Sequence, residues 1–279
     1  MNQGTLYIIA TPIGNRADMG ERAISVLKQV DLIAAEDTRH SKILLQHYNI
    51  STAMQAYHEH NEEQATPKLI QRILAGENIA LISDAGTPLL SDPGYRLVKA
   101  AHESSIKVSP VPGACAAIAA LSVSGLATDR FLFAGFAPHK QGARQNFYRE
   151  FEHQSATLVF YESSHRIVAS VKDMLQVFGA DRSIVLAREI TKLFETVRST
   201  TLGALPDWLE ADSNQQKGEF VMVLQGADEQ LSPQSAELEQ VLKVLLAELP
   251  VKQASQMAAK ITGLKKNAVY KFALEISGK

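Results

Sequence analysis

Ser83-Asp84-Ala85-Gly86-Thr87-Pro88-Leu89-Leu90-Ser91-Asp92-Pro93-Gly94 connects an apolar run at residues 79–82 to a helix-like segment at residues 95–102. A segment so rich in Gly, Pro, Ser and Asp does not pack a core, but it can bring bare backbone amides and carbonyls close to a small molecule. Strand-to-helix connections usually have about 2–6 residues, and this one is longer. We therefore interpret it as a ligand-binding loop at the carboxyl end of a strand, with an ordinary connection as the alternative.

Strand-like and helix-like segments alternate on both sides of this loop. Apolar runs of strand length occupy residues 6–10, 32–35, 79–82 and 108–111, and helical patterns follow them near residues 23–27, 41–45 and 95–102, with another at 67–74. Continuous apolar runs are typical of strands that are covered on both faces. This alternation predicts an α/β domain with a largely parallel sheet over residues 1–115.

Longer strand patterns begin after a stretch of small residues at 112–117. Residues 131–136, 157–161, 183–187 and 220–224 are expected to be strands, with helices near 164–178 and 204–211. They predict a second, mixed α/β domain over residues 116–228. Since ligands bind beyond the carboxyl ends of strands in open α/β sheets, the loops at 11–15, 84–91, 112–116 and 162–166 are expected to converge on one interdomain cleft.

Composition limits the class of protein. The chain has 279 residues, a net charge of −2 and a single cysteine, so an internal disulfide framework is excluded and a reducing compartment is expected. No run of 18 apolar residues is present. We expect a soluble, cytoplasmic protein without a membrane partner. His58 and His60 alternate in an extended segment, but two ligands without a third are a weak signal for a metal site. A polar loop that could face RNA is the favoured interpretation of this segment.

The tail, residues 234–279, follows a polar linker at 228–233 and carries three helical patterns. The first ends at Pro250, and the others cover residues 252–261 and 265–276. Ala259, Gly263 and Val269 have the spacing of a helix-turn-helix, although any three-helix bundle also needs small residues where helices cross. From residue 250 onward, six lysines face one acidic residue. Lys260, Lys265, Lys266 and Lys271 are therefore predicted to bind RNA phosphates.

Six motifs in order give the chain a family resemblance. They are Ala10-Thr11-Pro12-Ile13-Gly14-Asn15, the loop at 84–94, Val111-Pro112-Gly113-Ala114, Phe160-Tyr161-Glu162-Ser163-Ser164-His165-Arg166, Arg188-Glu189-Ile190-Thr191-Lys192 and Gly218-Glu219-Phe220. Over about residues 4–226, and on into the tail, the chain resembles the tetrapyrrole-methylase-like methyltransferases. It is most similar to the bacterial members that methylate the ribose 2'-hydroxyl of a decoding-centre cytidine in 16S ribosomal RNA.

This resemblance implies a two-domain fold with S-adenosylmethionine bound in the interdomain cleft. It also implies a homodimer, and 16S rRNA or the assembled small ribosomal subunit as partner. Thr87 departs from the family pattern, since members that act on tetrapyrroles have aspartate there. The positions that match the family's donor-binding residues are Pro12, Ile13, Ala85, Gly86, Thr87, Leu90, Cys115, Ala116, Tyr161, Glu162 and Ile190.

A ribose 2'-hydroxyl is a weak acid, so its methylation requires a positioned base or a cation that stabilises the developing alkoxide. The polar clusters beside the strand ends supply Glu189, Lys192, Glu195 and Arg39 as candidate catalytic residues. Solvated ion pairs and helix caps are the alternative roles for these clusters. Lys140, Arg144 and Arg149 are expected either on a solvated helix face or at phosphates. A C-methyltransferase for a tetrapyrrole or another small acceptor, and a non-catalytic RNA-binding protein, remain as alternative functions.

Overall fold

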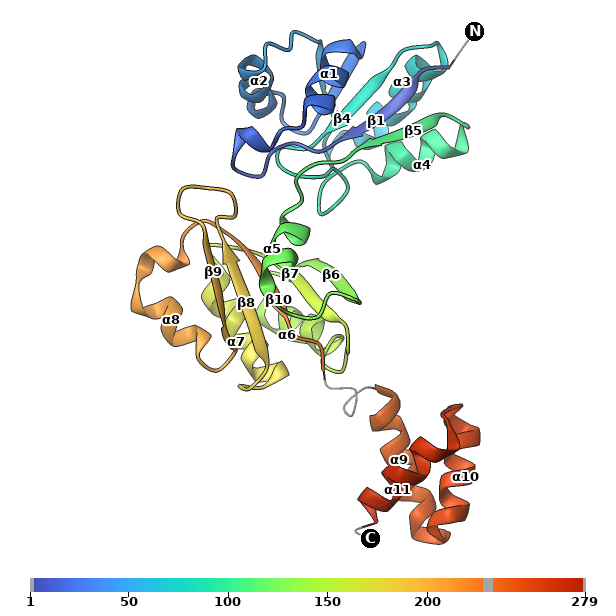
Figure 1. Cartoon of the computed structure of the whole chain (residues 1–279). Helices are drawn as coiled ribbons and strands as arrows, with labels where there is room; N and C mark the ends of the chain where they lie inside the picture. Colours follow the sequence, from blue (N-terminus) through green and yellow to red (C-terminus); the bar gives the residue numbers. More distant parts are fainter. Residues whose placement is uncertain (1–2, 228–232, 278–279) are drawn as a thin grey trace.

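A computed structural model describes residues 3–227 and 233–277 of the chain. Two β-sheets lie one beyond the other, and three helices near the C-terminus form a separate group (Figure 1). The predicted architecture, two α/β layers followed by a helical module, is confirmed. The predicted linker at 228–233 lies largely outside the described residues.

The first sheet has five parallel strands in the order β3-β2-β4-β1-β5. They are β1 (Thr5–Ile9), β2 (Leu32–Ala35), β3 (Met54–Ala56), β4 (Ile79–Ile82) and β5 (Lys107–Val111). Helices α1 (Glu21–Gln29) and α2 (Thr38–His47) pack on one face, and α3 (Glu62–Leu74) and α4 (Tyr95–Glu103) pack on the other. Both faces are therefore covered, which explains the continuous apolar sequence of β2 and β4.

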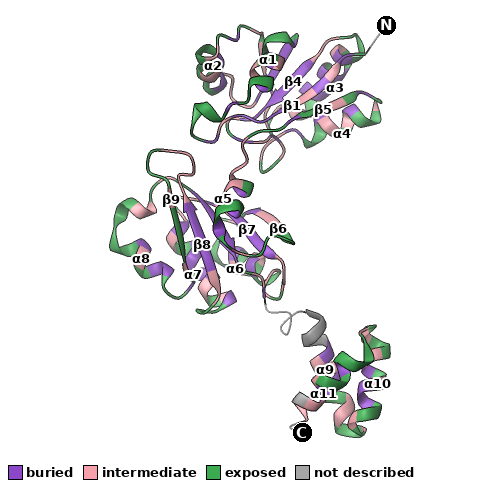
Figure 2. Cartoon of the chain, in the orientation of Figure 1, coloured by how far each residue is buried: buried purple, intermediate pink, exposed green. Residues whose placement is uncertain are grey.

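The second sheet is mixed, with the order β6-β7-β10-β8-β9. Its strands are β6 (Phe131–Phe136), β7 (Thr157–Ser163), β8 (Ser183–Arg188), β9 (Thr196–Thr201) and β10 (Glu219–Leu224), and only β6 and β7 are parallel. Helices α6 (Gln141–Arg149), α7 (Ile167–Phe178) and α8 (Leu205–Ala211) cover one face, whereas α5 (Ala116–Ser124) covers the other. Buried residues follow these strands through the centre of the layer (Figure 2).

Two strands, β3 and β9, are absent from the sequence-based prediction. The sequence of β9 is Thr-Val-Arg-Ser-Thr-Thr, and most of its side chains are exposed because it is an edge strand. An edge strand that faces solvent has no apolar run or alternation to detect. β3 has only three residues, all of them half-buried.

The expectation that Arg144 lies on a solvated face or at a phosphate is wrong. Its guanidinium is buried, and its Nε donates a 2.7 Å hydrogen bond to Oδ2 of Asp173 on α7. Gln141 and Gln145 donate to the other carboxylate oxygen of Asp173. Arg144 therefore joins α6 to α7 inside the second domain.

The C-terminal module consists of α9 (Pro233–Glu248), α10 (Val251–Thr262) and α11 (Lys266–Ile276) around a small core of their own. Gly263 has a φ of +71° in the turn between α10 and α11, and Val269 is fully buried, as the helix-turn-helix spacing predicts. Ala258 is the fully buried small residue, whereas Ala259 is only half-buried. In the part of the chain that the structure describes, no helix combines the length and hydrophobicity needed to cross a bilayer.

Candidate active site

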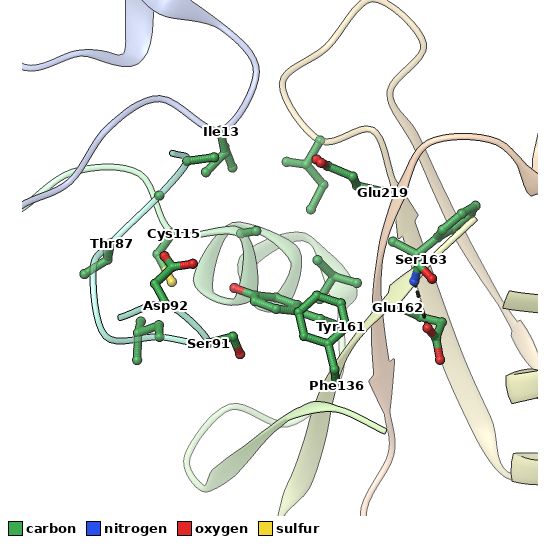
Figure 3. Close-up of a pocket in the computed structure, with 17 residues that line it drawn as sticks. Ile13, Thr87, Ser91, Asp92, Cys115, Phe136, Tyr161, Glu162, Ser163 and Glu219 are labelled. Carbon is green, nitrogen blue, oxygen red and sulfur yellow. Dashed lines mark hydrogen bonds between the residues drawn. The ribbon is translucent and has the colours of Figure 1, made fainter. Parts of the chain in front are cut away.

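The loops that follow the strand ends enclose one cavity between the two sheets. Its volume is about 330 Å³, near the lower end of the range of about 300–1,000 Å³ typical of small-molecule pockets. All four loops predicted to converge contribute to it, namely those at 11–15, 84–91, 112–116 and 162–166. Figure 3 shows Ile13, Asp92, Cys115 and Tyr161 around a common space.

The wall from the first domain is made largely of backbone. Thr11 and Gly86 exchange two backbone hydrogen bonds, of 2.8 and 3.0 Å, which fix the loop after β4 to the loop after β1. Gly86 has a φ of +85°, and a Cβ atom there would lie 3.3 Å from Cγ2 of Ile13. The hydroxyl of Thr87 donates to the carbonyl of Ala114 at 3.0 Å. This loop can therefore present backbone groups to a ligand, but the Thr87 hydroxyl is already bonded to the chain that leads to α5.

The wall from the second domain is aromatic. The ring of Tyr161 on β7 meets Phe133 and Phe136 edge-on, with centroid distances of 4.9 and 5.5 Å. Its hydroxyl accepts a hydrogen bond from the backbone N–H of Ala117 at 3.0 Å, and burial raises the pKa of this phenol. Tyr161 thus presents an apolar surface to the cavity while its polar end is satisfied.

Glu162 borders the same cavity, but its carboxylate turns away from it. Oε1 accepts hydrogen bonds from its neighbour's backbone, Ser163 N, and pairs with Arg166, both at 2.8 Å, while Oε2 accepts from Ser170 at 2.6 Å. Its side chain is fully buried. We infer that the side chain of Glu162 holds the end of β7 against the start of α7, and that only its backbone is available to a ligand.

Asp92 is the half-buried carboxylate of the cavity. It lies on the side of Cys115, facing Tyr161 across the space in Figure 3. No cation pairs with it among residues 3–227 and 233–277. Burial raises the pKa of Asp92 to about 6, and the negative charges of Glu36 and Asp84 act in the same direction against a hydrogen bond from Ser83. A carboxyl group with such a pKa can exchange a proton near neutral pH.

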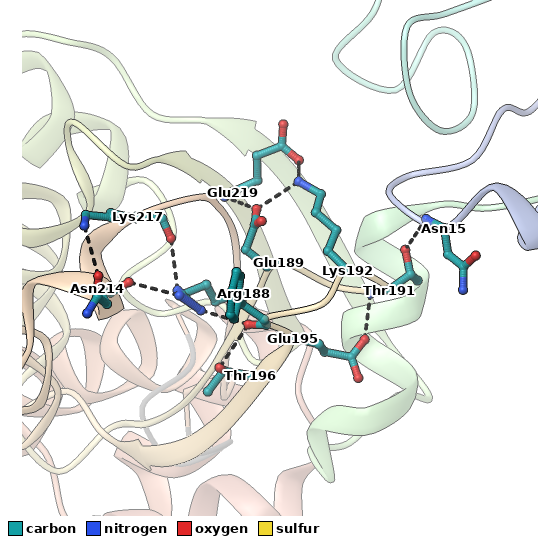
Figure 4. Close-up of polar contacts among 11 residues, drawn as sticks. Asn15, Arg188, Glu189, Thr191, Lys192, Glu195, Thr196, Asn214, Lys217 and Glu219 are labelled. Atoms are coloured by element: carbon teal, nitrogen blue, oxygen red, sulfur yellow. Dashed lines mark hydrogen bonds and ion pairs between the residues drawn. The ribbon is translucent and has the colours of Figure 1, made fainter. Parts of the chain in front are cut away.

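A second polar cluster lies at the opposite lip of the cavity, where Lys192 Nζ bonds to Oε1 of Glu189 and Oε2 of Glu219 at 2.8 Å each (Figure 4). Burial lowers the pKa of Lys192, but these two hydrogen bonds outweigh it and raise the pKa above its ordinary value. Burial conversely raises the pKa of Glu189, whereas hydrogen bonds from Lys192 and from the backbone of Glu219 lower it overall. Lys192 is therefore a cation and Glu189 an anion at neutral pH.

The loop that carries this cluster contacts the first domain. Asn15 N donates to the hydroxyl of Thr191 at 3.1 Å, and Thr191 N donates in turn to Oε2 of Glu195 at 2.6 Å. Glu189 and Thr191 both have positive φ angles, +51° and +67°. For residues other than glycine, a positive φ angle costs about 1–3 kcal/mol of conformational energy, and such residues are concentrated at functional sites. The close approach leaves no room at Gly14, where a Cβ would lie 2.4 Å from Cγ of Lys192.

The structure brings most of the predicted site residues together. Ten of the eleven expected donor-binding residues line the cavity, all except Pro12, which lies beside Ile13 in the same loop. Among the expected catalytic residues, Glu189 and Lys192 lie at the lip of the cavity, and Glu195 is exposed beside Thr191. Arg39 does not line the cavity, and its side chain is 90% exposed. Lys260, Lys265, Lys266 and Lys271 are all exposed on the C-terminal module.

Sequence reasoning missed several lining residues, of which Asp92 matters most. Asp92 stands within the loop on which the sequence analysis opens, and the signal that could have found it is a carboxylate directly before the Pro93-Gly94 helix start. Phe136 is the last residue of an almost wholly apolar strand, Phe-Leu-Phe-Ala-Gly-Phe, and its place at a strand end is the signal that could have found it. The other missed residues are Ser91, Ser163, Glu219, Phe220 and Val221.

Two family models match the chain. One describes the tetrapyrrole (corrin/porphyrin) methylases and covers residues 5–206, and the other describes the RsmI C-terminal HTH domain and covers residues 232–277. Among curated proteins, the chain is 52% identical to a protein of Pseudomonas aeruginosa, with 100% of each chain covered. It is 50% identical to a protein of Escherichia coli O157:H7, with 99% of this chain and 97% of the relative covered. Both relatives are named ribosomal RNA small subunit methyltransferase I.

Solved structures share the fold at much lower identity. Diphthine synthase aligns with 80% of this chain and 89% of its own, with a TM-score of 0.61 and 15% identity. The uroporphyrin-III-C-methyltransferase of Thermus thermophilus aligns with 80% of this chain and 94% of its own, with a TM-score of 0.56 and 21% identity. At such identities the likeness concerns the arrangement of the two sheets alone.

Proposed function

Because the chain belongs to the tetrapyrrole (corrin/porphyrin) methylase family, we propose that its cleft transfers a methyl group from S-adenosylmethionine to a cytidine ribose in small-subunit ribosomal RNA. At the level of reaction class, the protein is an S-adenosylmethionine-dependent rRNA methyltransferase, since relatives of about 50% identity over the full chain are rRNA methyltransferases. The finer assignments proposed here are the 2'-hydroxyl as acceptor, the decoding centre of 16S rRNA as target and the cytoplasm as location.

The residues of the cleft fit the proposed donor. Gly86 lies against Ile13, and because it has no Cβ its backbone stays accessible from the cavity. Bare peptide groups of this kind bind small polar ligands. Phe136 and Tyr161 line the opposite wall. Their aromatic rings attract cations such as the sulfonium group of S-adenosylmethionine. We propose that residues 85–87, with Ile13, Leu90, Cys115, Ala116, Tyr161 and Ile190, hold the donor.

S-adenosylmethionine supplies a methyl group on a sulfonium, which is a good leaving group. The chain must therefore position the ribose hydroxyl in line with that methyl group and accept one proton. We propose that Asp92 accepts the proton as the new oxygen–carbon bond forms and the sulfur–carbon bond breaks. Asp92 is chosen because it lines the cavity, has no cationic partner among the described residues and has a pKa of about 6.

Lys192 is proposed to stabilise negative charge at the acceptor. Its ammonium group is held in place by Glu189 and Glu219, and its raised pKa excludes it as a base at neutral pH. A fixed cation beside a developing alkoxide lowers the barrier because its orientation is set before the reaction. Glu189, whose carboxylate is bonded to Lys192 and to the backbone of Glu219, is thereby a positioning residue.

The observation that carries the proposal is the joining of this cleft to an exposed, lysine-rich helical module in one chain. A small acceptor such as a tetrapyrrole does not require a surface for a polyanion, and a protein that only binds RNA does not require an enclosed cavity with a carboxylate of raised pKa. The structural likeness to a uroporphyrin methyltransferase concerns the fold and therefore does not favour a small acceptor.

The test is methylation in a purified system. The protein is incubated with methyl-labelled S-adenosylmethionine and small ribosomal subunits, or their free rRNA, from cells that lack the protein. The RNA is then digested and its nucleosides are separated by mass spectrometry. We expect one labelled nucleoside, 2'-O-methylcytidine. Label on a base or on another nucleoside would contradict the acceptor, and absence of label from both substrates would contradict the function.

A further inference from the structure

The outward face of α2 is basic and lies in the first domain, far from the lysine-rich tail. Arg39, His40, Lys42 and His47 are exposed on this helix. Residues three or seven positions apart lie on the same side of a helix, which places Arg39 with Lys42 and His40 with His47. The chain contains no aspartate or glutamate from residue 38 to residue 58, although its net charge is −2. This face is a local excess of positive charge on a protein whose net charge is −2.

Both ends of α2 are attached to the loops that form the cleft. At its start, Asp37 N donates a 3.1 Å hydrogen bond to Oδ1 of Asp84, in the loop after β4. At its end, the hydroxyl of Tyr48 donates to the carbonyl of Arg16, one residue after the Asn15 that contacts Thr191 across the cleft. The basic face of α2 is therefore held in a fixed position beside the cavity.

The acidic groups near α2 leave this face positive. Oδ2 of Asp37 pairs with Nη2 of Arg39 at 2.8 Å, and its Oδ1 accepts from Nε of Arg39 at 3.2 Å and from the Arg39 backbone, so that Nη1 of the guanidinium is left outside the pair. An exposed ion pair of this kind contributes little, about 0–1 kcal/mol, so the guanidinium can turn its remaining donors to another anion. The carboxylate of Glu36 accepts from Asp84 N on the loop side. No ion pair to Lys42 occurs within residues 3–227 and 233–277.

We propose that the outward face of α2 is a second contact surface for the phosphates of the ribosomal RNA, with Arg39 and Lys42 as its main contacts. This inference rests on the proposed function. In Figure 1, α2 and the helical module stand at opposite ends of the molecule, with the cleft between them. A single RNA that touched both would cross the cleft mouth, and its target nucleotide would be positioned from two sides. Arg39 then acts by binding RNA and does not touch the reacting atoms.

The test compares two doubly substituted proteins with the same change in charge. Arg39→Gln/Lys42→Gln alters the proposed face, whereas Lys28→Gln/Lys107→Gln removes two exposed charges of the first domain outside α2, from the end of α1 and the start of β5. Affinity for free small-subunit rRNA is measured by filter binding from 0.05 to 0.3 M salt. Donor affinity, and the KM and kcat for RNA, are measured for each protein.

We expect the α2 variant to lose about 1.4–1.8 from the slope of log K against log salt, since each phosphate contact contributes about 0.7–0.9. Its KM for RNA should rise while kcat at saturating RNA and donor affinity stay unchanged. The control variant should behave as the wild type. Equal losses in both variants, an unchanged slope, or a fall in kcat at constant KM would each overturn the proposal. Failure of the proposed function is a separate result, because the wild-type protein itself would then not methylate rRNA.

Discussion

Asp92, the proposed base, shows how a loop can bring a carboxyl group of raised pKa into a cavity. Two non-glycine residues of its loop, Leu89 and Ser91, have positive φ angles, which turn the chain so that the carboxylate enters the cavity. Burial there and the neighbouring charges of Glu36 and Asp84 raise the pKa to about 6. A base with this pKa is ionised at neutral pH and is a stronger proton acceptor than an ordinary carboxylate.

Replacing Asp92 with the isosteric Asn should lower kcat by about 10²–10⁴-fold, the usual contribution of a general base. Donor affinity, measured by calorimetry, should change little. In the wild type, kcat should fall as the pH decreases through about 6, because protonated Asp92 cannot accept the proton, and this acid limb should vanish in Asp92→Asn. Asp207→Asn, a change in an exposed carboxylate on α8 that does not line the cavity, is the control. Loss of donor binding in Asp92→Asn would instead make Asp92 a counter-charge for the donor.

Arg144 and Asp173 give a residue-scale prediction for stability. Arg144→Met leaves a buried carboxylate without its cation, which typically costs about 3–5 kcal/mol. Arg149→Met, on the exposed side of the same helix, should change stability by at most about 0.5 kcal/mol. The measurement is urea unfolding followed by fluorescence of Trp208, which packs against the core of the second domain. Equal stability of the two variants would show that the pair contributes little.

The same pair predicts how stability depends on pH. Burial raises the pKa of Asp173, but hydrogen bonds from Gln145, Gln141 and Arg144 outweigh it, so the folded-state pKa lies below the ordinary value of 3.8. A carboxyl with a lowered pKa stabilises the folded state above its unfolded pKa. The contribution of the pair is therefore present at neutral pH and is lost as the pH falls below about 3.8.

At the scale of elements, connections form the backbone wall and the polar lip of the site, whereas strands β6, β7 and β10 supply the rest of its lining. The loop between β4 and α4 forms the backbone wall of the cavity, and the loop between β8 and β9 forms the polar lip. Both loops contain non-glycine residues with positive φ. They persist because hydrogen bonds to distant parts of the chain, such as those joining Gly86 to Thr11, hold them.

Gly86→Val should abolish donor binding while the protein stays folded, because the added side chain meets Ile13 and fills the cradle. Gly125→Val is the matched control. Gly125 also has a positive φ, +69°, at the end of α5, but a Cβ there has no neighbour within 4 Å. The control therefore includes the backbone strain without the obstruction. Calorimetry with S-adenosylmethionine measures both variants, and unchanged affinity in folded Gly86→Val would rule out this placement of the donor.

The helices α10 and α11 carry the second element-scale prediction. Alanine at Lys260, Lys265, Lys266 and Lys271 should weaken RNA binding and lower its salt slope by up to about 2.8–3.6, at about 0.7–0.9 for each contact. Turnover at saturating RNA should be preserved, since only uniform binding is lost. The control replaces Lys28, Lys68, Lys99 and Lys107, which are exposed on the first domain. An unchanged slope in the tail variant would leave the module as a packing or dimerisation element.

At the scale of the whole molecule, we propose a homodimer. One face of the second sheet is covered by α5 alone, and α5 exposes Ile118 and Val123. Leu193 and Phe194, in the loop between β8 and β9, are 90% and 66% exposed. Clusters of exposed large apolar side chains commonly mark protein interfaces. Light scattering at micromolar concentration should therefore give about 61 kDa, twice the 30.5 kDa of one chain. A particle of 30.5 kDa alone would contradict the proposal.

The sequence by itself determined the features that depend on neighbours along the chain. Fully apolar runs such as residues 79–82 predict buried strands because every side chain in a doubly covered sheet is buried. The loop at 83–94 and the turn at Gly263 are predictable because their backbone conformations require particular residue types. The lysine excess of the tail is a property of composition alone. Fold class, the cleft loops and the helical module therefore followed from the sequence.

Only the tertiary structure decided which polar groups of these segments are free to act. Glu162 and Asp92 both belong to loops at strand ends, yet Glu162 is neutralised by Arg166 while Asp92 faces the cavity without a cation in the described chain. Lys192 became a fixed cation through Glu219, and one hydrogen bond joins the two sides of the cleft, between Asn15 and Thr191, which are 176 positions apart in sequence. Charge state and access depend on distances between such remote residues, and a local pattern contains no information about those distances.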